Sequence, residues 1–345
     1  MGLLRARPKL ISALAVLALF AAGAAYQAIF GGMQAAGLHV EGNELVDRGQ
    51  VVRLLGVDWA GTDDACARTG TPIGGRSDAA AVRALRTWRV NAVRVPLNAE
   101  CWLGLGARYR TAIASFVARL HAKGLYVVLA LDRPGGRMPP AEPTAQFWRE
   151  VAKSFKGDHA LVFDLYGEPR DVDWFCWRDG CRDPAGGPRL AGMQLLVDSV
   201  RETGAKQPLL AGGLDRGNDL GSWLDRVPAD PEAQLVASFH TSQATRCAGA
   251  ACWNATVARV AKEVPVVTDT VGPSGCRPAF LERFAAWADA HGVSYLGAAW
   301  KPGPCARGSL IRDYAGSPTP AGLALKRHLA RLWGRDRTLR LVPPA

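Results

Sequence analysis

The chain has 345 residues, of which 48% are hydrophobic, and it carries a formal net charge of +11. This composition excludes a disordered chain and allows one large globular domain, because α/β barrels of this size fold as single units. A positive charge of this size is found in proteins that bind nucleic acid, but the basic residues here are scattered along helix faces and lack the interleaved aromatics that stack on bases. We therefore expect no nucleic-acid partner, and attraction to an anionic membrane or cell wall is a secondary interpretation.

The first 35 residues differ from the rest of the chain. Three basic residues precede residues 10–33, a stretch without charge that is long enough to cross a bilayer as a helix. This basic flank predicts a cytoplasmic N-terminus and an exported body. The alanine-rich run at residues 21–25 allows the other interpretation, in which residues 1–35 are a cleaved signal peptide. Both place the body outside the cell or on its surface, and both limit contact with the membrane to this segment.

After this segment the sequence predicts a β-hairpin and then a regular alternation of strands and helices. The hairpin turns at Gly42 and Asn43. Short β-branched or leucine-rich runs predict eight strands, at residues 51–57, 91–96, 126–131, 161–165, 208–211, 235–239, 264–268 and 294–299. Helical patterns follow at residues 78–88, 109–123, 144–155, 191–203, 220–224, 253–262, 278–291 and 321–332. Ser77 is the expected N-cap of the first helix.

Eight apolar strands, each followed by a helix, are typical of a parallel sheet that closes into a (β/α)8 TIM barrel. An open doubly wound sheet is the alternative, but it would need a glycine-rich phosphate loop after the first strand, and LLGVDWAGTDD contains none. We therefore predict an α/β barrel, with the N-terminal hairpin, over residues 36–334 and a basic tail at residues 335–345. If residues 10–33 remain as an anchor, the end of the barrel opposite its functional face should look toward the membrane. Four basic residues would then lie near anionic lipid headgroups: Arg331, Arg335, Arg337 and Arg340.

The eight cysteines are an even number, and disulfides persist in exported proteins. Zinc is disfavoured because no pair is spaced as C-x-x-C and no histidine lies within a few residues of a pair. The cysteines fall in the loops that follow predicted strands, where neighbouring loops can be bridged. We predict four disulfides at the rim of the functional face: Cys66–Cys101, Cys176–Cys181, Cys247–Cys252 and Cys276–Cys305.

The C-terminal ends of the strands, where barrels of this type carry their active sites, end in polar side chains. LVFDLYGEP delivers Glu168 at one strand end, and VPVVTDTVG delivers Asp269 and Thr270 at another. Sugar-cleaving enzymes commonly use two carboxyl groups across the glycosidic bond, one as a proton donor and one as a nucleophile or base. The first strand therefore offers a suitable acid, and the second offers a hydroxyl. Other strand ends carry Asp58, Arg94, Asp132, His240 and Trp300.

With these motifs in place, the chain resembles glycoside hydrolase family 5, the cellulase-type barrel enzymes. The resemblance also rests on LHVEGNELVDRGQVVRLLGVDWAG, NAVRVPLNAECWLG, the WFCWRDG loop, ASFH and YLGAAW, which together cover nearly the whole barrel. It implies a retaining enzyme that acts on β-linked glucans, mannans or related polysaccharides. We expect a carbohydrate ligand, no cofactor, no metal and a monomer.

The resemblance implies that Glu168 is the acid/base, although the asparagine that normally precedes it is Gly167 here. It places Thr270 at the position of the nucleophilic glutamate, and threonine needs an adjacent base or amine to act as a nucleophile. Asp269 lies one residue early. Because successive strand side chains point to opposite faces, we expect it to face away from the side of Thr270 unless the strand is twisted or bulged.

Other strand ends match the family or depart from it. Arg94, His240 and Trp300 match, and the resemblance implies a substrate-binding role, with Trp300 as a stacking floor for sugar. Barrel packing for Trp300 and a hydrogen-bonded core position for His240 are the alternatives. Asp58 and Asp132 replace an asparagine and a histidine. Because loss of the glutamate would leave Arg94 as a buried guanidinium without a counter-ion, we infer that Asp58 and Asp132 restore the charge balance.

Two functions follow from these substitutions. In the first, an exported protein binds a β-linked polysaccharide with lost or strongly reduced hydrolysis, because Thr270 replaces the nucleophile. In the second, an active glycosidase uses Glu168 as acid and Asp132, Asp58 or Asp269 as its second carboxylate. A retaining enzyme holds its two carboxyl groups about 5–5.5 Å apart. Because Thr270 stands at the position of the nucleophilic glutamate, we predict no nucleophilic carboxylate at that distance from Glu168. A surface protein that binds nucleic acid or lipid through its charge alone is a remote third alternative.

Overall fold

The structure is a computed structural model that describes residues 37–132, 137–272 and 275–335. The segment at residues 10–33 and the tail beyond residue 335 lie outside the described residues, so the predictions about them stay predictions. In the part of the chain that is described, no helix is long and apolar enough to cross a membrane.

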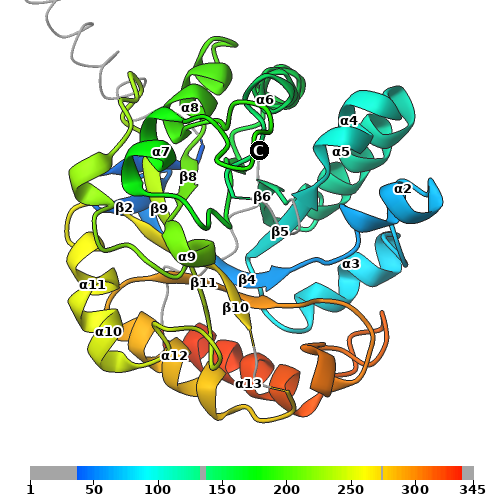
Figure 1. The fold of residues 1–345 in the computed structure, drawn as a ribbon. Helices are drawn as coiled ribbons and strands as arrows, with labels where there is room; N and C mark the ends of the chain where they lie inside the picture. The colour runs from blue at the N-terminus through cyan, green and yellow to red at the C-terminus, as the bar shows by residue number, and fades with distance from the viewer. Residues whose placement is uncertain (1–36, 133–136, 273–274, 336–345) are drawn as a thin grey trace, which may run out of the picture. The chain divides into compact units, whose positions relative to one another are not determined.

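Eight parallel strands close into one barrel, which confirms the predicted (β/α)8 fold (Figure 1). Hydrogen-bonded neighbours follow the order β10, β11, β4, β5, β6, β7, β8 and β9, so successive strands lie side by side. The strands are buried along almost their whole length, because helices cover the outer face and side chains fill the interior. Their bounds are β4 Leu55–Asp58, β5 Ala92–Leu97, β6 Tyr126–Leu131, β7 Leu161–Asp164, β8 Leu209–Gly212, β9 Leu235–Ser242, β10 Val266–Gly272 and β11 Ser294–Ala298.

Helices of unequal length connect the strands. The long ones are α5 Ala107–His121, α6 Ala141–Phe155, α8 Met193–Arg201, α12 Ala279–Ala290 and α13 Pro320–Arg335. The shorter ones are α2 Asp64–Thr69, α3 Ala79–Arg86, α4 Ala99–Gly104, α7 Trp174–Asp179, α9 Leu214–Gly217, α10 Ala250–Ala255 and α11 Val257–Val260, with 3-10 turns η1 Leu224–Arg226 and η2 Cys305–Arg307. The predicted helix at residues 253–262 is therefore two short helices. The predicted N-cap Ser77 is also wrong, because Asp78 Oδ1 accepts the Ala80 and Ala81 amides at 2.9 and 3.0 Å.

The predicted hairpin is present, but it is part of a three-stranded antiparallel sheet. β1 His39–Glu41 and β2 Glu44–Asp47 turn at the expected residues, and β3 Gln50–Val52 pairs with β2. The predicted strand at residues 51–57 is therefore divided between β3 and β4. The division falls at Arg53 and Leu54, where the Arg53 carbonyl accepts from Asn91 Nδ2 at 2.7 Å and the Leu54 amide donates to Ser294 Oγ at 3.0 Å.

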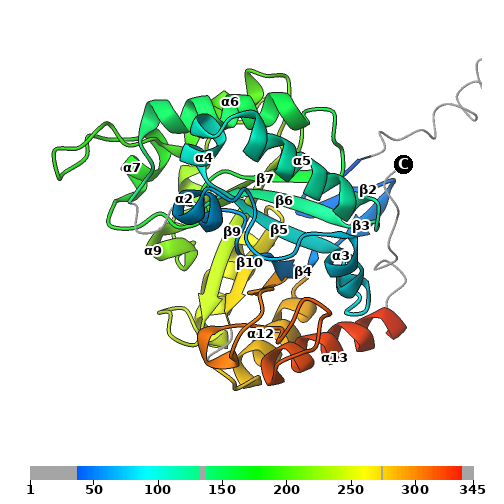
Figure 2. The ribbon, with the colours of Figure 1, turned by 90° about the vertical axis from the view of Figure 1, so that its right-hand side faces the viewer.

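This sheet closes the N-terminal end of the barrel. Figure 2 shows β2 and β3 at the end opposite to α2, α7 and α9. Apolar side chains of the sheet and of the segment leading into β4 form one buried cluster with residues of the barrel interior: Leu38, Leu45, Val52, Leu54, Ala92, Tyr126, Val128, Ala160, Val162, Leu210, Val236, Val267 and Leu296. A functional cavity of the barrel is therefore to be sought at the opposite end.

All four predicted disulfides are present: Cys66–Cys101, Cys176–Cys181, Cys247–Cys252 and Cys276–Cys305. Each lies in loops or short helices that follow the C-terminal ends of strands. The first joins the loops after β4 and β5, and the last joins the loops after β10 and β11, as the adjacency of barrel strands predicts. The disulfides thus hold together the rim around the C-terminal end of the barrel.

Candidate functional site

Arg94, on β5, is the centre of the polar groups at this end of the barrel. Its side chain is 1% exposed and lies among four carboxylates. Its Nη2 and Nη1 bond Asp132 at 2.9 and 3.1 Å, and its Nε bonds Asp269 at 2.9 Å. Its other contacts are to Asp164 at 3.3 Å and Asp58 at 3.5 Å. Asp58 and Asp132, the counter-ions that the sequence predicts for this guanidinium, both contact it.

β10 carries one extra residue where it reaches the site. Between Val267 and Thr270 the strand advances three residues while β9 advances two, and the register toward β11 shifts in the same stretch. The Asp269 side chain points into the barrel, where it contacts Arg94 and His240, and it lies two residues after Val267, which also faces the barrel interior. The sequence predicts that Asp269 reaches the site only through a twist or bulge of its strand, and β10 has such a bulge while Asp269 points into the barrel.

His240, on β9, lies between Asp269 and Glu168. Its Nε2 is 3.0 Å from Asp269 Oδ1, and its Nδ1 is 3.9 Å from Glu168 Oε1. The ring fits between two glycines, because a Cβ added at Gly167 would lie 2.9 Å from Nε2 and one added at Gly217 would lie 2.8 Å from Cγ. Although burial disfavours its charged form, the negative charge of Asp269 raises the pKa of His240 to about 9. The ring is therefore a cation at neutral pH.

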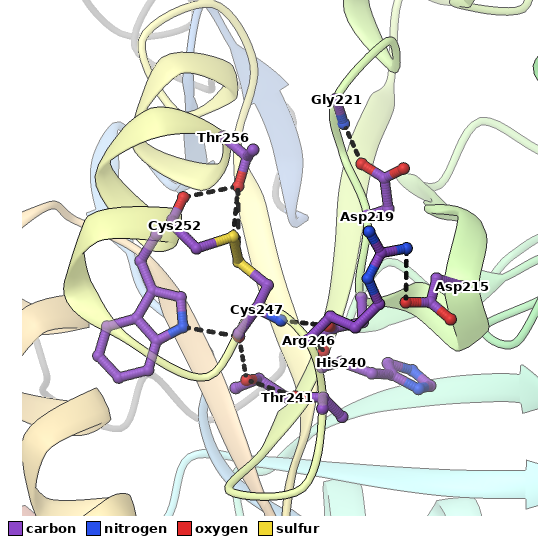
Figure 3. The surroundings of a disulfide bond; sticks show 12 residues. Asp215, Asp219, Gly221, His240, Thr241, Arg246, Cys247, Cys252 and Thr256 are labelled. Carbon is purple, nitrogen blue, oxygen red and sulfur yellow. Dashed lines mark hydrogen bonds and ion pairs between the residues drawn. A yellow bond between two sulfur atoms is a disulfide. The ribbon is translucent and has the colours of Figure 1, made fainter.

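The loop after β9 fixes the backbone that carries His240 (Figure 3). Asn218 Nδ2 donates a 2.7 Å hydrogen bond to the His240 carbonyl, and Asn218 Oδ1 accepts one of 2.7 Å from the Cys247 amide. Thr241 Oγ1 donates to the Cys247 carbonyl at 2.9 Å. Because Cys247 is also bonded to Cys252, the disulfide and these hydrogen bonds hold one rigid segment.

The buried acids differ in their protonation. Burial raises the pKa of Asp58 to about 7 against the favourable charge of Arg94. Burial and the negative charge of Asp269 raise the pKa of Asp164 well above its usual range. Burial would also raise the pKa of Asp269, but the charges of His240 and Arg94 hold it below the usual range. The pKa shifts of Asp164 and Asp269 are therefore opposite, and Asp164 is the more easily protonated of the two.

Glu168 follows β7 and is the most open carboxyl group of this constellation. Its side chain is 45% exposed, against 29% for Asp132 and 13% for Asp58. Its ion pair with His240 is long, so its carboxyl group keeps access to solvent. Thr270 is half-buried and pairs with His240 in the strand register. The structure thus places an accessible acid at the strand end where the sequence predicts one.

Trp300 lies in the interior of the protein. Its side chain is fully buried, and its ring packs edge-on against Trp88, with centroids 4.8 Å apart, and beside Trp59, with centroids 6.3 Å apart. The ring therefore presents no open face to a sugar, and the stacking-floor interpretation is replaced by barrel packing.

A cavity of about 540 Å³ opens beside Asp132. It lies over the loops after β4, β5 and β6 and over the start of α6, and its lining is rich in acids. Burial and the charge of Asp132 raise the pKa of Asp63. The polar lining residues are Asp63, Asp64, Arg68, Asn98, Glu100, Asp132 and Thr144. Within the described residues, no group of three or more His, Cys, Asp or Glu side chains is arranged to hold a metal ion.

Sequence reasoning missed Asp164 and Asp63. Asp164 lies in LVFDLYGEP, four residues before Glu168, and it is the one charged residue of the strand predicted at residues 161–165. An acid inside an otherwise apolar buried strand requires a partner, and that signal could have connected Asp164 with Arg94. Asp63 carried no comparable signal, because it lies in a polar loop.

Comparison with known proteins identifies similar sequences and folds. The model of the family Cellulase (glycosyl hydrolase family 5) matches residues 53–303. No protein of curated function matches the chain.

Solved structures with the same fold include a β-glucanase from Saccharophagus degradans, at 18% identity and a TM-score of 0.70, covering 87% of this chain and 95% of that one. An endoglucanase catalytic domain from Thermobifida fusca is 15% identical with a TM-score of 0.64, covering 85% of this chain and 97% of that one. A structure from Cytophaga hutchinsonii is 17% identical with a TM-score of 0.68, covering 86% and 95%.

Proposed function

The chain belongs to the cellulase family, glycosyl hydrolase family 5, and from that premise we propose that it is an exported protein that binds a β-linked polysaccharide and has lost, or nearly lost, hydrolysis. Glu168 holds the acid/base position of the family in this proposal, and Thr270 replaces the nucleophile. Arg94, His240 and Asp58 form the charged base of the site.

One observation carries this proposal: Asp269, the carboxylate beside Thr270, is engaged on every side. It is fully buried and contacts Arg94 at 2.9 Å, His240 at 3.0 Å and Ser238 at 2.7 Å. A nucleophile must reach the sugar's reacting carbon with a free lone pair, and a lowered pKa makes an oxygen a weaker nucleophile. Asp269 therefore acts as the counter-ion of two cations, and this role supports the loss of hydrolysis.

Carbohydrate binding is supported by the openness of the same end of the barrel. Glu168 is half-exposed, and the cavity beside Asp132 offers carboxylates that accept hydrogen bonds from sugar hydroxyls. The Saccharophagus degradans β-glucanase has been solved in complex with cellotetraose. We propose a cello-oligosaccharide or related β-glucan as the ligand of this chain.

An active glycosidase with altered machinery is the second candidate. It would use Glu168 as the acid and Asp132, Asp58 or Asp269 as the second carboxylate. Asp132 favours it because its carboxylate is 29% exposed and lines the cavity. Asp58 favours it because burial raises its pKa to about 7, where a group can exchange protons at neutral pH. A water directed by either carboxylate would lead to inversion of the sugar's configuration.

The test uses the purified full chain on soluble β-glucans and mannans, with reducing-end release measured beside calorimetric binding of cellotetraose. We expect the natural protein to bind cellotetraose and to release reducing ends no faster than the Glu168→Gln variant does. The matched control is Glu282→Gln, an exposed acid on α12. Hydrolysis that Glu168→Gln abolishes and Glu282→Gln leaves intact would establish the second candidate. Absence of both binding and hydrolysis would contradict both. Recovery of the protein from the culture medium or the cell surface tests its export.

A further inference from the structure

We infer that the N-terminal end of the barrel carries a docking surface for an anionic lipid membrane, formed by Arg86, Arg89, Lys123, Lys326, Arg331 and the indole of Trp333. We call these six residues the basic face. The inference concerns the folded barrel itself and does not depend on whether the barrel cleaves a polysaccharide.

Contacts between distant parts of the chain assemble the basic face. The Trp333 indole, near the end of α13, donates a 2.8 Å hydrogen bond to the Arg89 carbonyl, and the Arg89 guanidinium lies 6.0 Å from the indole centroid. Arg86, at the end of α3, bonds the carbonyl of Lys123 after α5 at 2.5 Å. Lys326 extends over the ring of Trp88, at 5.9 Å from its centroid. Arg86, Arg89 and Lys123 thus lie at the ends of α3 and α5, Arg331 is exposed near the end of α13, and Lys326 lies in the middle of α13 beside Trp88.

These cations have no acidic partner. α3 and α13 contain no Asp or Glu, and the ion pairs among the described residues include none of the five cations of the basic face. Asp289, which contacts α13 through His328 at 2.7 Å, is also engaged by Arg53 at 2.9 Å. The basic face therefore retains its positive charge for an external anion.

The position of the basic face favours a membrane as that anion. α3, α5 and α13 end on the side of the barrel where β2 and β3 lie, opposite to α2, α7 and α9 (Figure 2). Gly37 lies two residues before this sheet and donates to Asp47 of β2, and the residues before it in sequence include the uncharged stretch 10–33. Trp333 is half-buried and amphipathic, which suits a lipid headgroup region, where tryptophan is enriched. A soluble polyanion would explain the charge alone and neither the tryptophan nor the preceding apolar stretch.

The test follows lysine acetylation by mass spectrometry in the full chain bound to nanodiscs of phosphatidylcholine alone or mixed with phosphatidylglycerol. We expect Lys123 and Lys326 to react roughly threefold or more slowly on the anionic discs, and high salt to remove the difference, because screening weakens attraction to the headgroups. Lys301, exposed after β11 at the other end, is the internal control and should react equally on both discs.

Charge reversal supplies a matched pair of variants. Arg86→Glu/Arg331→Glu should abolish the protection of Lys123 and Lys326. Arg307→Glu/Arg312→Glu changes the net charge equally in the exposed loop between β11 and α13 and should leave the protection intact. Equal acetylation on both discs would overturn the inference. Equal protection by soluble heparin without lipid would assign the surface to polyanions and would overturn it too.

Discussion

The ends of β7 and β10 present their carboxyl groups in opposite ways. Glu168, after β7, is 45% exposed and has one long ion pair at 3.9 Å to His240. Asp269, in β10, is completely buried and contacts one hydroxyl and two cations. A carboxyl group can serve as a chemical acid, which needs access to the substrate, or as a structural counter-ion, which needs buried cations around it. The contacts of Glu168 suit the first role, and those of Asp269 suit the second.

His240 lies between these two strand ends and interacts more strongly with Asp269, in β10, than with Glu168. Its contact with Asp269 is 3.0 Å and raises its pKa to about 9, whereas its contact with Glu168 is 3.9 Å. Arg94, Asp269 and His240 therefore form one buried group of ion pairs, and Glu168 lies at the edge of this group. Stability measurements should distinguish this group from Glu168.

The largest effect is expected for Arg94→Met. The variant leaves Asp269 and Asp132 without their shared guanidinium, and breaking a buried ion pair from one side costs about 3–5 kcal/mol of unfolding free energy. Urea denaturation followed by tryptophan fluorescence measures the loss. Arg83→Met, an exposed change on α3, is the control and should stay within about 0.5 kcal/mol of the natural protein. A loss below about 1 kcal/mol for Arg94→Met would mean that the cluster does not hold the fold together.

The pH dependence of stability should report the pair of His240 and Asp269. The pKa of His240 is about 9 in the folded state and near 6.5 in an unfolded chain, so its contribution is complete below about 6.5 and is lost as the pH rises through 9. The difference corresponds to about 3 kcal/mol between neutral and alkaline pH. Urea titrations across this range should show the decline, and His240→Gln should flatten it. The exposed His291→Gln should keep it, and an unchanged slope in His240→Gln would refute the assignment.

Gly167→Ala should disturb the border between the two strand ends. The added methyl would lie 2.9 Å from the His240 ring, and overpacking of this kind costs about 1–3 kcal/mol. The NMR signal of His240 should shift along with the loss of stability. Gly157→Ala is the control, because a Cβ there meets nothing within 4 Å. Equal stability of the two variants would indicate that the ring of His240 moves aside freely.

The smallest effect on stability is expected for Glu168→Gln. Its side chain is half-exposed and its single ion pair is long, so the unfolding free energy should change by less than about 0.5 kcal/mol. Combined with a loss of glycan binding, this result would mark Glu168 as a functional acid. A loss of stability comparable to that of Arg94→Met would instead place Glu168 inside the buried cluster.

Much of this architecture could be predicted from the sequence, because the barrel is periodic. Strands and helices alternate with regular lengths, and the adjacency of strands in a closed barrel predicts which loops a disulfide can join. The need of Arg94 for counter-ions followed from the cost of burying a guanidinium, and Asp58 and Asp132 supply two of them.

The remaining features depend on single-residue departures from that periodicity. The bulge in β10 adds one residue between Val267 and Thr270, and no residue of VPVVTDTVG marks it. The division between β3 and β4 likewise involves a side chain far away in the sequence, because Ser294 accepts a hydrogen bond from the Leu54 amide. The burial of Trp300 depends on Trp88 and Trp59, whose positions follow only from the closed fold.

The sheet at the N-terminal end of the barrel also has a mechanical consequence. Gly37 donates to Asp47 at 3.2 Å, Leu38 donates to the His159 carbonyl at 2.9 Å, and Val40 accepts and donates hydrogen bonds with Gln234. Tension applied to the chain ahead of Gly37 therefore meets attachments to β2 and to the loops before β7 and β9 together. The load is distributed across the base of the barrel, so a tethered domain would be pulled as a rigid body before its first strand could peel away.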